Sequence, residues 1–375
     1  MTAYFLLIGV ILIAYFITQP YVNNRIFEIK WFRKTHQVNR NQIFLFWVTI
    51  SLILFAGLRS PHMGNDISGY LAGLHFYEGY DKSYILKAPK VYPYGYETLY
   101  WLLMKICAFF GFSDSAYLTL CAILIYTPVM YFINKYSEDS LISVMMYIAF
   151  FLPSSITVLR QMIALGVLLM AYDRLIQKKY VCFFILIIIA SFIHTSSILA
   201  LIILLFYKIG SKKLFWLTIV LELFVRAAGR RIVLFVLRFF PSYQYYVGSE
   251  YDISTGGLHV NLILLNVLFI IALIWLTRVE QDEKRIFENN FFFAGSSLAI
   301  LTQAAGYSFG VLGRINLNFS LSNAIILPKV INRAFKEKSR IIARMLIVVF
   351  FIAYSLLTIY GDKTICPYIS LFERP

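Results

Sequence analysis

The sequence predicts an all-α, polytopic integral membrane protein with about 12 transmembrane helices, within a range of about 11–14. Hydrophobic residues make up 60% of the 375 residues and charged residues only 14%, a balance that a soluble globular domain does not need. Stretches such as 4–18, 42–58 and 341–360 are apolar on all sides, as helices that cross a bilayer must be. We therefore expect a single integral membrane domain over residues 1–375, with residues 4–18 as a retained span.

Basic residues set the predicted orientation, because cytoplasmic loops collect Lys and Arg. The block from Arg25 to Arg40 is expected to be cytoplasmic, which places the N-terminus outside. Residues 59–114 and 228–258 are then the two long extracytoplasmic segments. The later basic loops all lie in the cytoplasm if the remaining spans lie near 115–133, 141–158, 161–176, 181–193, 195–207, 214–227, 259–277, 289–306, 311–328 and 341–360.

Two segments fit this count poorly. Residues 96–111 are apolar enough to span, but a full span there would move the later basic loops outside, so we expect a non-spanning helix. Residues 181–207 allow only two spans of about 13 residues, each about 20 Å long, against a hydrocarbon core of about 30 Å. Either this pair dips around a water-filled cavity, or one basic loop is misassigned. The polar run from His194 to Ser197 lies at the break.

Three arginines stand at the outer ends of apolar segments, where a positive charge is unusual. They are Arg59, Arg160 and Arg314. Arginine binds phosphate through a forked pair of donors, so the three predict binding of a lipid-linked phosphate or pyrophosphate. An interfacial salt bridge with Asp66 is the structural alternative for Arg59, and snorkelling to headgroups is the alternative for Arg160.

Three side chains are candidate general bases at the same face: Asp66, His194 and Glu97. Asp66 is the first choice, because it follows Arg59 closely in a loop that turns at Pro61 and Gly64. His194 is the second choice, because a histidine at membrane depth is more often functional than one in a soluble core. A packing role for His194 is the alternative.

Two further groups of residues suit a charged, sugar-bearing ligand. Arg230 and Arg231 belong to a stretch that would form an interfacial helix, either as a leaflet anchor or to steer a pyrophosphate. Tyrosines of the outer segments either form an aromatic belt or present ring faces to sugars. The candidate sugar-binding residues are Tyr70, Tyr94, Tyr96, Tyr243 and Tyr246.

Several other functions find no support in the sequence. The His, Cys and acidic residues show no metal-ligand spacing, so we expect neither a metal nor another cofactor. The four cysteines form no CxxC motif and are expected to be small buried hydrophobic residues. The net charge of +15 lies mostly in short loops, which favours contact with membrane lipids over nucleic acid.

Taken together, the motifs resemble the EpsG/Wzy family of polysaccharide polymerases. Each motif is short, but their order runs through most of the chain, from about residue 55 to about residue 330. The motifs are Arg59 with Asp66 and Tyr70, Tyr94 to Glu97, Leu159-Arg160-Gln161 with Ala164, His194 with Ser196, the Tyr-rich stretch Ser242 to Tyr246, and Gly313-Arg314. The resemblance implies a fold related to GT-C glycosyltransferases.

The resemblance also implies an activity: polymerisation of undecaprenyl-pyrophosphate-linked oligosaccharides into O-antigen or a related surface polysaccharide. We expect this reaction to be metal-independent, because the sequence shows no metal-ligand cluster and arginines can stabilise the leaving pyrophosphate. It places the protein in the bacterial cytoplasmic membrane, with its active site facing the periplasm or outside, and suggests a chain-length regulator as a partner. A flippase or exporter of lipid-linked oligosaccharide is the alternative outside enzymes, although no internal repeat favours it. An O-antigen ligase, which transfers from the same donor to a lipid A-core acceptor, is the second alternative.

Overall fold

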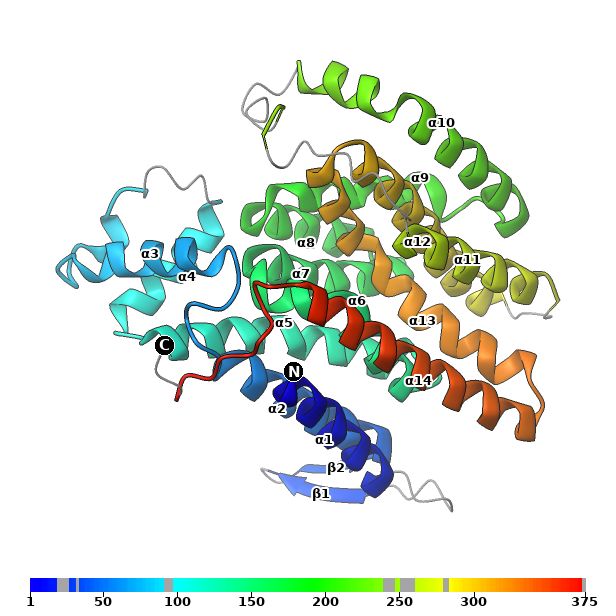
Figure 1. Ribbon diagram of the computed structural model, residues 1–375, viewed down its shortest axis with the longest axis horizontal. Coiled ribbons are helices and arrows are strands. Elements are labelled where there is room, and N and C mark those ends of the chain that lie inside the picture. Colours follow the sequence, from blue (N-terminus) through cyan, green and yellow to red (C-terminus); the bar gives the residue numbers. More distant parts are fainter. Residues whose placement is uncertain are drawn as a thin grey trace. The chain divides into compact units, whose positions relative to one another are not determined.

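The computed structural model describes residues 1–18, 27–31, 34–90, 97–238, 247–249, 260–278 and 283–372. These residues are predominantly helical, so the predicted helical class is confirmed (Figure 1). The α-helices are α1 (Thr2–Thr18), α2 (Arg40–Gly57), α3 (Ile67–Glu78), α4 (Thr98–Phe109), α5 (Asp114–Tyr136), α6 (Ser140–Thr157), α7 (Leu159–Ile176), α8 (Tyr180–Ile193), α9 (Ile203–Phe206), α10 (Ser211–Leu237), α11 (Val260–Arg278), α12 (Glu283–Ser308), α13 (Leu317–Ala334) and α14 (Glu337–Gly361).

One β-hairpin departs from the all-α prediction. Strands β1 (Phe27–Trp31) and β2 (Lys34–Val38) pair antiparallel, with Phe27 opposite Val38 and Trp31 opposite Lys34. In β1, the aromatic and β-branched residues Phe27, Ile29 and Trp31 alternate with Glu28 and Lys30, which favours a pleated strand. The sequence predicts only a basic cytoplasmic block in this segment, because its charged residues are a stronger signal than the alternation of its hydrophobic residues.

Short 3₁₀ helices replace part of two predicted spans. The region 195–207 is mostly the 3₁₀ helix η2 (Thr195–Ile202), followed by the four-residue α9, and the predicted span 311–328 begins with η5 (Gly310–Asn316). A third 3₁₀ helix, η1 (Ile85–Lys87), lies between α3 and α4. An apolar run does not distinguish 3₁₀ from α geometry, so the sequence could not predict this difference.

Four helices in the described part of the chain are long and apolar enough to cross a membrane: α2, α5, α6 and α14. The total of about 12 spans stays a prediction. Of the apolar window of α6, 78% is buried, against 17% for α14. Thus α6 packs among other helices on all sides, whereas α14 exposes Ile342, Leu346 and Val349 as a lipid-facing helix would.

The chain divides into two compact units, which we describe separately. The first comprises Met1–Arg174, Tyr180–Thr195 and Ile341–Pro375. In this unit α2 packs against α1 and α5, and Arg344 of α14 pairs with Asp139, 2.6 Å from Nε to Oδ2. Asp139 also caps the first turn of α6 by accepting the amide of Leu141.

The second unit comprises Leu175–Lys179 and Ser196–Arg340, with α12 packed against α10, α11 and α13. Phe269 stacks on Phe293 with ring centroids 4.3 Å apart. At Gly295 the two helices α12 and α13 approach so closely that a Cβ atom would lie 1.9 Å from Ser322 Oγ. Small residues of this kind let helices pack tightly in a membrane.

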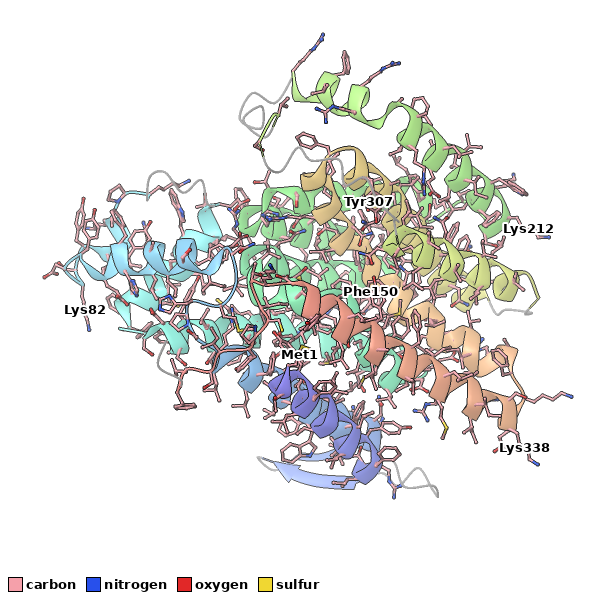
Figure 2. All side chains as sticks on the ribbon, in the orientation of Figure 1. Met1, Lys82, Phe150, Lys212, Tyr307 and Lys338 are labelled. Atoms are coloured by element: carbon pink, nitrogen blue, oxygen red, sulfur yellow. The ribbon has the colours of Figure 1, made fainter. Side chains whose placement is uncertain are left out.

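The described residues of the segment 59–114, which is predicted to be extracytoplasmic, form α3, η1, α4 and the start of α5. Tyr70 of α3 contacts Tyr100 of α4 edge to face at 5.3 Å, and Lys105 of α4 donates to Ala88 O at 2.6 Å. The predicted helix at 96–111 exists as α4, whose 12 residues reach only about 18 Å. Its length suits a helix that does not span. Figure 2 shows Lys82, between α3 and η1, projecting away from the helices.

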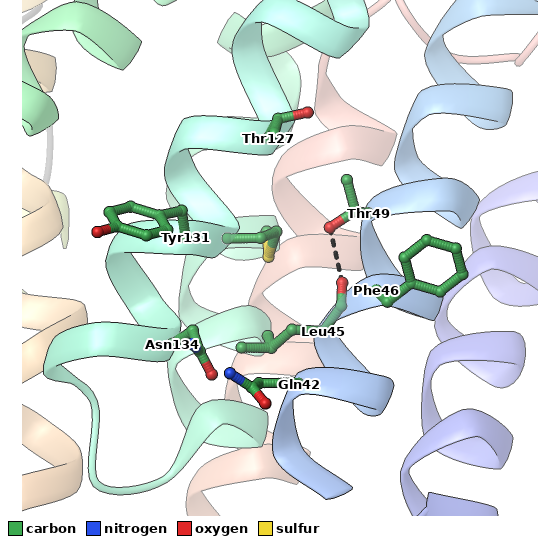
Figure 3. Close-up of a pocket in the computed structure, with 8 residues that line it drawn as sticks. Gln42, Leu45, Phe46, Thr49, Thr127, Tyr131 and Asn134 are labelled. Atoms are coloured by element: carbon green, nitrogen blue, oxygen red, sulfur yellow. Dashed lines mark hydrogen bonds between the residues drawn. The ribbon is translucent and has the colours of Figure 1, made fainter. Parts of the chain in front are cut away.

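A shallow groove of about 160 Å³ lies between α2 and α5 (Figure 3). Its polar groups are largely bonded to the protein, because Thr49 Oγ1 donates to Leu45 O at 2.6 Å. The groove contains none of the candidate site residues. Its lining residues are Gln42, Leu45, Phe46, Thr49, Thr127, Met130, Tyr131 and Asn134.

Candidate active site

Glu97 is the centre of the candidate site. It occupies the N-cap position of α4 with extended backbone, yet its side chain does not bond to its own helix. The carboxylate points instead to the start of α7 and to the junction of α8 with η2, and its side chain is only 14% exposed. A buried carboxylate must find partners of opposite charge or hydrogen-bond donors, and these two elements supply them.

Three hydrogen bonds and one nearby imidazole nitrogen surround this carboxylate. Oε2 accepts a hydrogen bond from Arg160 Nη1 at 2.7 Å. Oε1 accepts from the backbone amide of Thr195 at 2.7 Å and from its hydroxyl at 3.0 Å. His194 Nδ1 lies 3.3 Å from the same Oε1. The structure thus joins three of the predicted site residues, Glu97, Arg160 and His194, in one cluster within the first unit.

Local folding rules explain how the partners of Glu97 are placed. Helix α6 ends at Thr157 and α7 begins at Leu159, so Arg160 lies in the first turn of α7 with almost no loop before it. Helix α8 ends at Ile193, and the amide of Thr195 begins the 3₁₀ helix η2. The first amides of a helix lack intrahelical partners. Glu97 accepts a hydrogen bond from one of these unpaired amides, that of Thr195, although the two residues are far apart in the sequence.

The environment of Glu97 sets its charge. Burial alone would raise the pKa of the carboxyl, but the close approach of His194, the charge of Arg160 and the Thr195 amide lower that pKa to about 2. The group is therefore ionised at neutral pH. A carboxylate with so low a pKa accepts protons poorly, which removes the main reason to assign Glu97 as the general base.

The proximity of Glu97 to Nδ1 favours one tautomer of a neutral His194. An imidazole that faces a carboxylate through Nδ1 carries its proton there, which leaves the lone pair on Nε2. The carboxylate orients the ring and would stabilise the imidazolium formed on proton uptake. The cluster can therefore accept a proton at His194 Nε2, beside the fixed guanidinium of Arg160. This combination suits the transfer of a group away from an anionic leaving group.

Two other predicted residues lie in the loop after α2. Asp66 is half-buried at the N-cap of α3, and its side chain makes no capping bond there. Arg59 is only 1% exposed. Among the described residues Arg59 forms no ion pair, so the interfacial salt bridge with Asp66 is wrong as an account of Arg59. The role of Asp66 as a base stays a prediction.

The remaining predicted residues do not join the Glu97 cluster within the described residues. Tyr70 is buried at 3% exposure and packs on Tyr100 instead of presenting a ring face to a sugar. In the second unit Arg314 is exposed on η5, and Arg230 and Arg231 are exposed on α10, which continues to Leu237 without a break. Tyr94, Tyr96, Tyr243 and Tyr246 lie outside the described residues.

Sequence reasoning gave Thr195 no role, although it supplies two of the three hydrogen bonds to Glu97. A hydroxyl residue directly after His194, at a predicted helix break, was the available signal. Among the described residues no group of three or more His, Cys, Asp or Glu side chains could hold a metal ion.

Comparison with known proteins identifies a family. A family model described as the EpsG family matches residues 42–370, which include most of α2, the helices from α3 to α14 and the whole Glu97 cluster. No curated protein matches the chain, and no solved structure does.

Proposed function

Because the chain belongs to the EpsG family, we propose that it is a membrane glycosyltransferase that polymerises undecaprenyl-pyrophosphate-linked oligosaccharide repeat units into O-antigen or a related surface polysaccharide. The Glu97–Arg160–His194 cluster is the observation that carries the proposal. It combines a group that accepts a proton with a cation that stabilises a leaving pyrophosphate, the two needs of this transfer.

In the proposed reaction, a hydroxyl of one lipid-linked chain attacks the anomeric carbon of another. A new carbon–oxygen bond forms, and the bond between the anomeric carbon and the pyrophosphate oxygen breaks. His194 Nε2 takes the hydroxyl proton, and undecaprenyl pyrophosphate departs with the bonding electron pair. Glu97 is a positioning residue that orients His194 and carries the compensating negative charge. Asp66 is retained as a second candidate base.

Arg160 is proposed to stabilise the charge that grows on the leaving pyrophosphate. Its guanidinium is fixed by Glu97 at 2.7 Å, so little reorganisation is needed when the charge develops. The N-terminus of α7, where Arg160 lies, adds a helix dipole that also favours an anion. Arg314, Arg230 and Arg231 are proposed as further contacts to the pyrophosphate of either lipid-linked chain.

The reaction requires no metal in this proposal, because arginines supply the positive charge. Polymerisation by the purified protein should therefore persist in excess EDTA. Loss of activity on chelation, with recovery on adding Mg²⁺, would contradict the arginine-based mechanism.

The direct test uses the purified protein in lipid nanodiscs or proteoliposomes with a lipid-linked repeat unit. A ladder of longer lipid-linked products supports polymerisation. Movement of the lipid across the bilayer without a new bond indicates a flippase, and transfer to a lipid A-core acceptor indicates a ligase. His194→Gln should abolish the ladder, whereas His62→Gln, which changes an exposed histidine outside the cluster, should preserve it.

A further inference from the structure

Arg59 is the most deeply buried charged side chain described in the structure and has no role in the reaction above. It follows α2, is 1% exposed and ranks among the largest fully enclosed side chains of the chain. A buried cation without a counter-charge costs several kcal/mol in a protein interior. Something that neutralises Arg59 is therefore required.

One edge of the Arg59 guanidinium makes no hydrogen bond to the described residues. Nη1 donates to the backbone oxygen of Ala56. Nε and Nη2 are both buried, and neither has a hydrogen-bond partner among the described residues. These two donors share one edge of the planar group and form the fork with which arginine binds an anion in a bidentate manner.

No carboxylate is among the strongest electrostatic influences on Arg59. The titratable side chains with the strongest influence are Tyr126, Cys121, Tyr368 and Tyr4. The hydroxyl of Tyr126, on α5, is also buried without a hydrogen-bond partner among the described residues. Donors without acceptors thus gather around a positive charge, which is the chemistry of an anion site.

The C-terminal segment Thr364–Leu371 covers Arg59. The amide of Ser60 donates to Ile369 O at 2.8 Å, and the amide of Leu371 donates to Leu58 O at 2.8 Å. Arg59 itself forms a β-bridge with Ser370. Further bonds from Tyr4 OH to Ile365 O and from Tyr368 OH to Phe55 O hold the segment in place. A bulky lipid-linked head group has no approach to the fork past this cover.

We propose that the fork of Arg59 holds a small inorganic anion, chloride or phosphate, beneath the C-terminal segment. The anion neutralises the guanidinium and stabilises the loop 58–66 against residues 364–371. This assignment replaces the sequence-based expectation that Arg59 binds the substrate pyrophosphate. It does not depend on the proposed polymerase activity.

The first test measures thermal unfolding of the purified full chain in nanodiscs. Chloride or inorganic phosphate replaces gluconate at constant ionic strength, because a ligand that binds only the folded state raises its stability. We expect the wild-type midpoint to rise by roughly 2–4 °C with chloride. Arg59→Gln should not respond, whereas the matched control Arg238→Gln, which alters an exposed arginine, should respond like the wild type.

The outcomes of this test identify which anion occupies the site. A rise with phosphate alone, lost in Arg59→Gln, supports the site and identifies an oxyanion as its occupant. No rise with either ion, or an equal rise in Arg59→Gln, overturns the proposal. If Arg59→Gln does not fold, structures of the wild-type protein in bromide and in phosphate decide the question, because an empty fork under both conditions overturns the site.

Discussion

At the scale of single residues, Glu97 has more partners than its place at the end of a short helix would suggest. Four groups from Arg160, His194 and Thr195 converge on its two oxygens. In the proposed mechanism a carboxylate held in this way positions other groups and is not the general base. Its substitution should therefore affect the rate of transfer through His194 and Arg160.

We predict that Glu97→Gln lowers turnover by roughly 100-fold or more, because the amide keeps the shape of the side chain but cannot hold the imidazolium of His194. The apparent KM for the donor should change much less than kcat, since Glu97 does not touch the donor in this mechanism. Steady-state kinetics with a lipid-linked repeat unit would measure both constants. Glu78→Gln, which alters an exposed residue at the end of α3, is the matched control. Equal effects on both constants would indicate that Glu97 binds the donor.

The lowered pKa of Glu97 also predicts how stability depends on pH. Its pKa falls from an ordinary value of 4.5 to about 2 in the folded protein, so the folded state binds the proton more weakly than the unfolded state. The contribution, on the order of 3 kcal/mol, is complete above the unfolded pKa and disappears as pH falls through the folded pKa. The wild type should lose thermal stability between about pH 5 and pH 2. Glu97→Gln should be less stable at pH 7 and show a flatter profile, whereas parallel profiles would contradict this assignment.

At the scale of elements, the position of Arg160 depends on how α7 packs against α5. A Cβ atom at Gly166 of α7 would lie 2.7 Å from Pro128 Cγ and 3.0 Å from Leu124 O. The carbonyl of Leu124 is the one that Pro128, which has no N–H, cannot bond within the helix. Because Gly166 has no side chain, α7 can lie close to α5 beside Pro128.

Gly166→Val should destabilise the protein by roughly 1–3 kcal/mol, because a branched side chain would force the two helices apart. It should also lower activity by displacing Arg160 in the same helix. Thermal unfolding and the polymerisation assay would measure the two effects. At Gly210 an added Cβ meets nothing within 4 Å, so Gly210→Val is the matched control for the change in composition. A Gly166→Val protein as stable as Gly210→Val would show that the close packing contributes little.

Most helices were predictable from the sequence because apolar runs of 15 or more residues favour helices in a bilayer. The short helix α4 was also predicted, because the basic loops required residues 96–111 not to span. The hairpin β1–β2 and the 3₁₀ geometry of η2 and η5 were not predicted, since composition does not encode backbone geometry at this level. In the candidate site, each of Glu97, Arg160 and His194 was recognised from its chemistry. Their mutual contact was not, because Arg160 lies 63 positions from Glu97 and Thr195, the residue after His194, lies 98 positions from it, so that only tertiary packing joins them.

At the scale of the whole molecule, the proposed activity requires the Glu97 cluster to face the outside of the cell, where lipid-linked repeat units are joined. The orientation predicted from basic loops places the segment that carries α3 and α4 outside. Three exposed lysines lie in segments that the predicted topology assigns to different sides of the membrane. Lys82 follows α3, Lys212 lies in the first turn of α10, and Lys338 lies in the first turn of α14 (Figure 2).

We predict that cysteine at position 82 reacts with a membrane-impermeant maleimide in intact cells after removal of the outer barrier. Cysteines at positions 212 and 338 should react only after the cytoplasmic membrane is permeabilised, because both belong to predicted cytoplasmic loops. The background chain should have Cys182 replaced by serine, since this native cysteine is exposed, whereas Cys107 and Cys121 are buried. Labelling at position 82 only after permeabilisation would invert the topology and place Glu97 on the cytoplasmic side. A polymerase acting on the outer face would then be ruled out, whatever the chemistry of the cluster.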